Sequence, residues 1–130
     1  MENAVDPTLG LPGHLGIRLL EASPDRVVAT MTITENHLQP LGYLHGGASV
    51  ALAETVASYG GFTSLKPGQA VFGVEINANH IRPKRAGVLR AVGSPLHRGR
   101  TTQVWQIHIF DENEKLVCTS RCTLGITDEN

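Results

Sequence analysis

The chain has 130 residues, 41% of them hydrophobic, and its 11 basic and 12 acidic residues leave a formal net charge of −1. This length suits a single domain, and a charge so close to neutral argues against a protein that binds nucleic acid. No apolar run is long enough to span a bilayer, and the first residues resemble no signal peptide, so we expect a cytoplasmic protein without membrane contact.

The first half of the chain predicts a flexible start and two strands. Residues 1–14 are rich in Pro, Gly and polar residues and predict a flexible N-terminal segment ahead of a single domain over residues 15–130. Residues 15–21 predict a first strand. Residues 25–34 alternate between apolar and polar positions and predict a second, half-buried strand. Its predicted apolar face comprises Val27, Ala29, Met31 and Ile33.

The middle of the chain predicts one helix, over residues 46–64. Small or apolar residues cover most of its circumference, which is typical of a helix enclosed by other elements. Consecutive strands with short turns follow, and this order predicts an α+β fold in which one helix packs on an antiparallel sheet. The expected strands after the helix are residues 71–81, 87–96, 101–110 and 115–126. In the first of these strands, one predicted face carries Phe72, Val74, Ile76 and Ala78, and the other carries Glu75, Asn77 and Asn79.

Two cysteines, Cys118 and Cys122, fall on the last of these strands. Four residues of extended chain separate them by about 13 Å, which is too far for a disulfide bond. We therefore expect both to be reduced thiols in the core.

Glu54 stands alone in the middle of the predicted helix. It is the only Asp, Glu, Lys or Arg between Glu35 and Lys66, and its helical neighbours offer no cation for an ion pair. A solvated surface glutamate is the ordinary alternative. Because burying an unpaired carboxylate is costly, a functional role is favoured here.

The start of the helix forms a second candidate site. Gly46 and Gly47 leave backbone N–H groups open to a ligand, and the helix dipole adds positive potential, so an oxyanion can bind there. His45 and Gln39 can add donors to the same pocket. The alternative is an ordinary helix N-terminus that His45 caps.

Distance along the helix separates these two candidates. Glu54 lies nine residues after His45, which places them about 13 Å apart on a straight helix, too far to act on one carbonyl. They can cooperate only if a second chain supplies the partner group. The sequence therefore predicts an obligate dimer with two composite sites.

Six of the basic residues fall in one window without any acid, which predicts a local anion-binding surface. The six histidines are scattered, with no spacing typical of a metal site, so no metal is expected. His80 and His108 are expected to be structural hydrogen-bond partners or residues on a strand surface. The basic residues of the window are Arg82, Lys84, Arg85, Arg90, Arg98 and Arg100.

With these residues in view, the chain resembles the hotdog-fold thioesterases over about residues 15–127. The resemblance is to the branch of small acyl-CoA thioesterases that includes the 4-hydroxybenzoyl-CoA, phenylacetic-acid-pathway, enterobactin-proofreading and 1,4-dihydroxy-2-naphthoyl-CoA enzymes. The matching segments are QPLGYLHGGAS (39–49), AE (53–54), EINANHIR (75–82), PLHRG (95–99) and QVWQIHIFD (103–111).

The resemblance implies a fold, an assembly and a reaction. It implies one long helix wrapped by a curved antiparallel sheet, a dimer that forms the active site, and a homotetramer of two dimers. The implied reaction is hydrolysis of a thioester to a free acid and CoA, with CoA as part of the substrate and no cofactor. An aromatic acyl group is expected, with 1,4-dihydroxy-2-naphthoyl-CoA as the specific candidate.

The resemblance also implies roles for individual residues. Glu54 would be the nucleophile or general base, Gly46 and Gln39 would hold the thioester oxygen, and His45 would orient the site or assist the departing thiolate. Ser58 would position water or substrate beside Thr55, and Tyr43 would contact the acyl group. The CoA phosphates would meet Arg82, His97, Gly99, Arg100 and Thr101, with Arg98 and Lys84 as lesser candidates.

Two other functions on the same fold are weighed against this hypothesis. A non-catalytic acyl-CoA-binding protein would bind CoA without releasing thiol, and the set of Gln39, His45, Gly46 and Glu54 argues against it. A hydratase would use an Asp and His pair within one helix region, and the sequence has no such pair.

Overall fold

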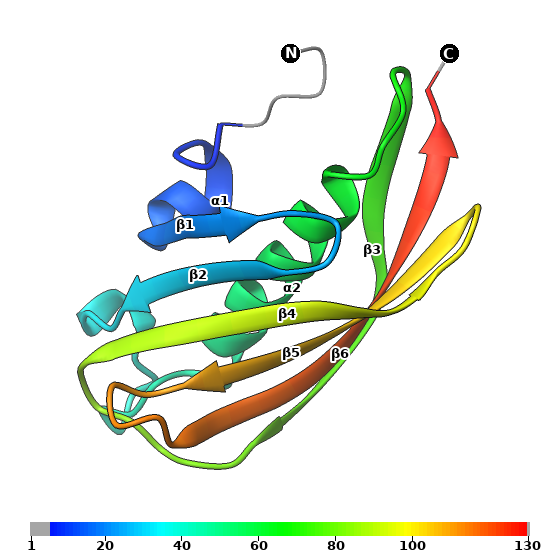
Figure 1. Ribbon diagram of the computed structural model, residues 1–130. Coiled ribbons are helices and arrows are strands. Elements are labelled where there is room, and N and C mark those ends of the chain that lie inside the picture. Colours follow the sequence, from blue (N-terminus) through cyan, green and yellow to red (C-terminus); the bar gives the residue numbers. More distant parts are fainter. Residues whose placement is uncertain (1–5, 130) are drawn as a thin grey trace.

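Six antiparallel strands curve around one long helix in the computed structural model, which describes residues 6–129 (Figure 1). Every predicted strand and the helix are present, and their ends lie within two residues of the predicted bounds. The elements are α1 (Gly10–His14), β1 (Ile17–Ala22), β2 (Val27–Thr32), the 3₁₀ helix η1 (Glu35–His37), α2 (Gly46–Phe62), β3 (Gln69–His80), β4 (Val88–Arg98), β5 (Thr102–Phe110) and β6 (Leu116–Asp128).

The sheet has the strand order β1-β2-β4-β5-β6-β3, and each neighbouring pair is antiparallel. Strands β1 and β3 therefore form the two edges. Helix α2 contacts all six strands, and Figure 1 shows it lying across one face of the curved sheet. This is the α+β hotdog arrangement that the resemblance implies.

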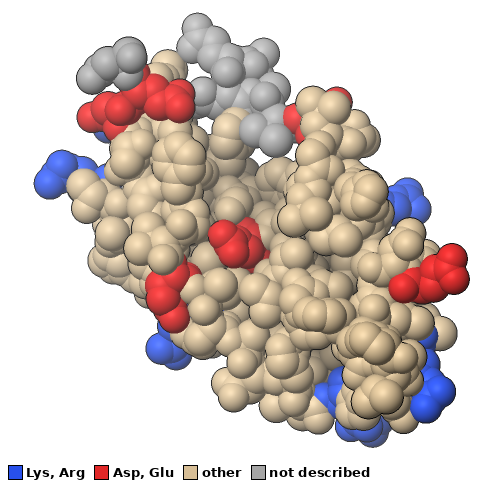
Figure 2. Space-filling view, turned by 180° about the vertical axis from the view of Figure 1, so that it is seen from behind, with Lys and Arg blue, Asp and Glu red and all other residues tan. Residues whose placement is uncertain are grey.

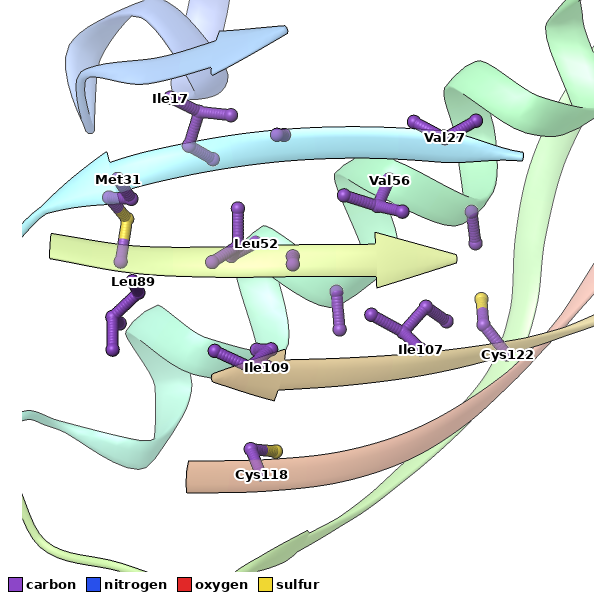
Figure 3. Close-up of a cluster of buried hydrophobic side chains, with 14 of the residues drawn as sticks. Ile17, Val27, Met31, Leu52, Val56, Leu89, Ile107, Ile109, Cys118 and Cys122 are labelled. Atoms are coloured by element: carbon purple, nitrogen blue, oxygen red, sulfur yellow. The ribbon is translucent and has the colours of Figure 1, made fainter. Parts of the chain in front are cut away.

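The core lies between α2 and the sheet, as Figure 3 shows. Leu52 and Val56 of α2 are fully buried against Met31, Leu89 and Ile107 of three strands. Glycines allow the close approach of helix and sheet. An added Cβ at Gly60 would lie 2.3 Å from the Trp105 ring, so a larger residue there would force the helix outward.

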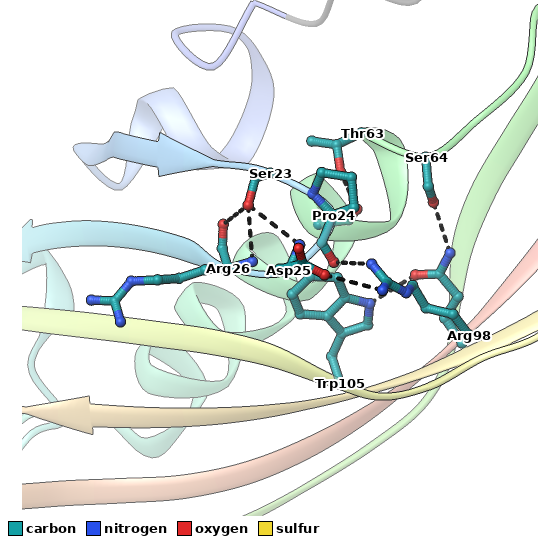
Figure 4. Close-up of polar contacts among 10 residues, drawn as sticks. Ser23, Pro24, Asp25, Arg26, Thr63, Ser64, Arg98 and Trp105 are labelled. Atoms are coloured by element: carbon teal, nitrogen blue, oxygen red, sulfur yellow. Dashed lines mark hydrogen bonds and ion pairs between the residues drawn. The ribbon is translucent and has the colours of Figure 1, made fainter.

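Polar contacts fix the C-terminal end of α2 and the β1–β2 turn (Figure 4). The buried Trp105 indole donates to Gln103 Oε1, and Gln103 Nε2 donates to Ser64 Oγ. Arg98 pairs with Asp25 at 3.0 Å and donates to the carbonyl of Pro24. These bonds tie β4 and β5 to segments far away in the sequence.

Both cysteines are free and buried, as predicted. Burial raises the pKa of the Cys118 thiol. Burial, together with the negative charges of Glu54 and Glu75, raises the pKa of Cys122 to about 12. Both groups are therefore protonated at neutral pH.

Helix α1 lies within residues 1–14, which the sequence predicts to be a flexible segment and of which residues 1–5 lie outside the described part. The Asp6 side chain accepts hydrogen bonds from Thr8 N–H and Thr8 Oγ1, and Leu9 N–H donates to the Asp6 carbonyl. This local turn leads into α1, where Pro12 sits in the first turn and loses no hydrogen bond. Periodicity gives no signal for so short a helix.

Strand β3 corrects the prediction of its apolar face. The alternation of residues 71–81 predicts one apolar face, but Phe72 and Val74 are 57% and 67% exposed. The register shifts between Gly73 and Glu75, so the inward face changes from odd to even positions at this bulge. Ile76 and Ala78 pack on the core as expected, whereas before the bulge Gly73 pairs with the buried Leu124 and faces α2.

Candidate active site

His45 caps helix α2 through its side chain. Its Nδ1 accepts the Gly47 N–H at 2.7 Å, as the ordinary N-cap alternative predicts. An imidazole nitrogen that accepts a backbone N–H carries no proton, so the proton of the neutral ring lies on Nε2. The N–H of Gly46, the first helical residue, has no intrahelical acceptor. Capping thus occupies Gly47 and leaves Gly46 available for an oxyanion.

The turn before α2 holds Gln39 in a defined position. Gln39 N–H donates to the Tyr43 carbonyl, Gly42 N–H donates to the Gln39 carbonyl, and Leu41 N–H donates to Gln39 Oε1. Because Oε1 is engaged by this N–H, the side-chain NH₂ is the group left to donate to a ligand. Leu44 N–H donates to the Lys84 carbonyl and fixes the other end of the turn.

Glu54 lies in a hollow of about 860 Å³ along one side of α2. On the face seen in Figure 2 the surface is hollowed, and an acidic group lies inside the hollow. Glu54 is partly buried, and an added Cβ on Gly73 would lie 2.2 Å from its Oε2. Among residues 6–129, neither a hydrogen bond nor an ion pair engages its carboxylate. The acid therefore lies against β3 without a cation.

Thr55 and Ser58 line the same hollow as Glu54. Thr55 Oγ1 donates to the Ala51 carbonyl at 2.6 Å, so the Thr55 oxygen can only accept from a ligand. Ser58 follows Glu54 by one helical turn and borders the hollow beside Tyr59. Burial and the negative charge of Asp6 raise the pKa of Tyr59, which keeps this phenol protonated.

A second pocket, of about 430 Å³, lies at the start of α2. Gln39, Tyr43 and Gly46 line it together with His80 and Arg82. The His80 ring lies over Gly46, because an added Cβ on Gly46 would be 2.8 Å from His80 Nε2. The sequence assigns His80 only a structural or surface role, although it belongs to the EINANHIR segment that carries the resemblance.

The predicted catalytic residues thus divide between two places in one chain. Glu54, Thr55 and Ser58 border the large hollow, whereas Gln39 and Gly46 border the pocket at the helix start. His45 is exposed at the helix N-terminus. This division agrees with the spacing of about 13 Å along the helix that the sequence gives.

The predicted CoA-binding residues lie at opposite ends of β6. Arg82 N–H donates to the Val117 carbonyl near the start of this strand. At its other end Ile126 N–H donates to the Thr101 carbonyl. Nine strand residues separate these two bonds by about 30 Å. Arg82 and the β4–β5 turn of one chain therefore cannot hold the same phosphate.

The β4–β5 turn carries the other predicted CoA residues. Gly99 and Arg100 border a small pocket of about 220 Å³ beside Ser64 and Gln103. His97 lies against Gly99, since an added Cβ there would be 2.8 Å from His97 Nε2. Thr101 is exposed at the tip of the turn.

Three further predicted ligand contacts have partners within the chain. Lys84 pairs with Asp111 at 3.6 Å and with Glu112 at 2.9 Å. Arg98 pairs with Asp25 in the β1–β2 turn. Tyr43, which is predicted to contact the acyl group, has the Arg85 guanidinium 4.3 Å from the centre of its ring, and its hydroxyl accepts a hydrogen bond from Arg85. Lys84 and Arg98 are thus less suited to phosphate binding than Arg82 or Arg100.

Within residues 6–129, no cluster of three or more His, Cys, Asp or Glu side chains could hold a metal ion. In the same part of the chain, no helix has the length and apolar character needed to cross a membrane.

The curved antiparallel sheet around one long helix, with an acid on that helix and a free N–H at its start, defines a hotdog-fold thioesterase. The family model of the thioesterase superfamily matches residues 41–118, and the chain belongs to this superfamily. It is therefore a thioester hydrolase, and a purely binding role is not favoured.

Two relatives are named 1,4-dihydroxy-2-naphthoyl-CoA hydrolase. The one from Listeria monocytogenes is 48% identical over 91% of this chain and 96% of its own. The one from Escherichia coli is 49% identical over 88% of this chain and 84% of its own. Among solved structures, a thioesterase from Haemophilus influenzae has a TM-score of 0.84 and 47% identity, covering 89% of this chain and 81% of its own.

Proposed function

We propose that the protein hydrolyses an aromatic acyl-CoA to the free acid and CoA, with 1,4-dihydroxy-2-naphthoyl-CoA as the specific candidate substrate. The names of the relatives from Listeria monocytogenes and Escherichia coli support this substrate. A relative from Cronobacter turicensis, named proofreading thioesterase EntH, is 45% identical over 87% of this chain and 82% of its own. A bulky acyl group also fits a hollow of about 860 Å³.

The unpaired carboxylate of Glu54 in that hollow is the observation that carries the proposal. A carboxylate without a cation is free either to attack the thioester carbonyl, giving a mixed anhydride, or to take a proton from an attacking water. In the first case water then cleaves the anhydride. In both cases the sulfur leaves as the CoA thiolate, and the acid is released.

The start of α2 supplies hydrogen-bond donors that stabilise the negative charge formed when the thioester carbonyl is attacked. Gly46 N–H and the Gln39 NH₂ border one pocket and can both donate to the oxygen that becomes negative in the tetrahedral intermediate. His45 Nε2–H is a further donor, placed to orient the substrate or to protonate the departing thiolate. Ser58 and Thr55 hold water or substrate beside Glu54.

The site is composite in this proposal, because Glu54 and the oxyanion donors of one chain border different pockets. A two-fold axis places Glu54 of one chain against Gln39 and Gly46 of the other, twice in each dimer. The open edge strand β3, with exposed Phe72 and Val74, is the surface suited to this pairing. A tetramer of two such dimers in the cytoplasm completes the proposed assembly.

Pairing across β3 also explains the positions of the basic residues. Antiparallel β3 strands bring Arg82 of one chain to the same side as the β4–β5 turn of the partner, with His97, Gly99, Arg100 and Thr101. Arginine suits the pyrophosphate and 3′-phosphate of CoA. The proposed partners are this small-molecule substrate and a second copy of the chain, with no nucleic acid, membrane or cofactor.

A thiol-release assay over aromatic, medium-chain and short-chain acyl-CoAs tests the proposal. Wild-type protein is expected to release thiol fastest from aromatic substrates. Glu54→Ala and Glu54→Gln should lower kcat by about three orders of magnitude or more while the fold is retained. The matched control is Glu21→Gln, an exposed glutamate that pairs with Arg26. Wild-type turnover in Glu54→Gln, or CoA binding without thiol release, would refute the proposal.

A further inference from the structure

Leu41 is an exposed apolar side chain on a rigid turn. Its side chain is the most exposed of the large hydrophobic residues described, at 78%. The turn that carries it is held by the backbone hydrogen bonds of Gln39, Gly42 and Leu44. This leucine is therefore barely buried within its own chain. The turn holds an apolar group at the surface, two residues from Gln39.

The hollow around Glu54 has matching chemistry. Leu11 of α1 and Leu9, the residue before this helix, form one wall although they are 58% and 67% exposed, and Val50 and Ala51 of α2 form another. Among the described residues that line this hollow, no cation occurs. At about 860 Å³ and open to solvent, the hollow has room for an aromatic acyl group and for one further side chain.

The position of Gln39 brings these two features together. Leu41 follows Gln39 by two residues, so the two Cα atoms are at most about 7 Å apart, and Leu41 N–H donates to Gln39 Oε1. If the Gln39 NH₂ of one chain reaches a thioester carbonyl beside Glu54 of the other, the Leu41 backbone comes within about 7 Å of Gln39 at the mouth of the same hollow.

We propose that Leu41 of one chain closes the acyl-binding hollow of its partner and sets the preference for bulky acyl groups. This inference rests on the proposed composite site. Leu41 contacts the acyl group and takes no part in proton transfer. The leucine therefore acts on selectivity between substrates and leaves the chemistry itself to Glu54, Gln39 and Gly46.

Leu41→Ala tests the contact. Loss of three methyl or methine carbons from an apolar pocket is expected to lower kcat/KM for an aromatic acyl-CoA by about tenfold or more, with a smaller effect on acetyl-CoA. Leu20→Ala is the matched control, because Leu20 is 57% exposed on β1 and outside both pockets. An unchanged ratio of aromatic to acetyl turnover in Leu41→Ala would overturn the proposal.

Mixed dimers show which chain supplies the leucine. A dimer of one Glu54→Ala chain and one Gln39→Ala chain has one intact site, made of Glu54 from the second chain and Gln39 from the first. Adding Leu41→Ala to the Glu54→Ala chain should lower aromatic selectivity about tenfold, whereas adding it to the Gln39→Ala chain should not. The reverse pattern would overturn the proposal. If the mixed dimer of Glu54→Ala and Gln39→Ala chains, with Leu41 intact in both, regains no activity, the composite site itself is refuted.

Discussion

Gly73 holds open the space that the Glu54 carboxylate occupies. An added Cβ would lie 2.2 Å from Glu54 Oε2, which no packed structure tolerates. Gly73→Ala is therefore expected to displace the carboxylate by about 1 Å and to lower kcat by about 100-fold, because catalytic geometry is this sensitive to displacement. Measurement of kcat together with the thermal midpoint separates a displaced acid from an unfolded chain.

Gly125→Ala is the matched control for this substitution. Gly125 lies on β6 beside the same stretch of β3, and an added Cβ would meet only Val74 Cγ2, at 3.1 Å. Its kcat should stay within about twofold of wild type, since a contact at 3.1 Å needs a shift of only a few tenths of an ångström. Because Val74 lies on the β3 edge proposed for pairing, the dimer content of Gly125→Ala is measured together with its kcat. If Gly73→Ala turned over substrate as fast as Gly125→Ala, the placement of Glu54 against β3 would be wrong.

The sequence identifies candidate site residues more readily than it predicts the contacts that those residues make. Glu54 is conspicuous because no other charged residue shares its segment, and the glycine pair marks the helix start. Gly73 and His80 leave no such signal, since their importance lies in contacts between β3 and α2 that only the folded chain creates. A glycine inside a strand is the one available hint.

An ion-paired cluster joins the loop before β4 to the β5–β6 turn. Lys84 pairs with Asp111 and Glu112, and Asp111 Oδ1 also accepts the N–H groups of Asn113 and Lys115. The Lys115 N–H above all lowers the pKa of Asp111, and the hydrogen bond from Lys84 lowers that of Glu112. The same loop holds the Gln39 turn, because the Lys84 carbonyl accepts Leu44 N–H.

This cluster predicts a loss of stability in acid. A carboxylate whose pKa is lowered by folding stabilises the native state above its unfolded pKa, and the contribution disappears as pH falls through the folded pKa. The free energy of unfolding should therefore fall steeply below about pH 4. Urea unfolding at a series of pH values measures this slope. Asp111→Asn should flatten it, and an identical slope in the variant would contradict the assignment.

The sequence predicts best those strands and helices that have a long, regular pattern of apolar and polar residues. The alternation of residues 25–34 and the small-residue helix both match β2 and α2. The apolar face of β3 is predicted wrongly, because one bulge residue reverses the inward side and alternation carries no record of a bulge. Helix α1 is missed because a side-chain turn at Asp6, and not periodicity, starts it.

At the scale of the whole molecule, the proposed composite site makes one chain an incomplete enzyme. Helix α2 carries the acid on its third turn and the proposed oxyanion donor at its first residue, and the two border different pockets. An open β3 edge, a hollow with apolar walls and a rigid turn with an exposed leucine all lie on surfaces that a second copy can cover. The spacing of His45 and Glu54 predicts a second chain, but alternation and spacing within one sequence do not encode which surfaces the two chains bring together.

The most direct test of the composite site is the thiol-release rate of mixed dimers. Glu54→Ala and Gln39→Ala chains, each nearly inactive alone, are co-expressed in equal amounts. Random pairing makes half of the dimers mixed, each with one intact site, so about one quarter of wild-type activity is expected. A rate no higher than the mean of the two parent variants would contradict a site shared between chains.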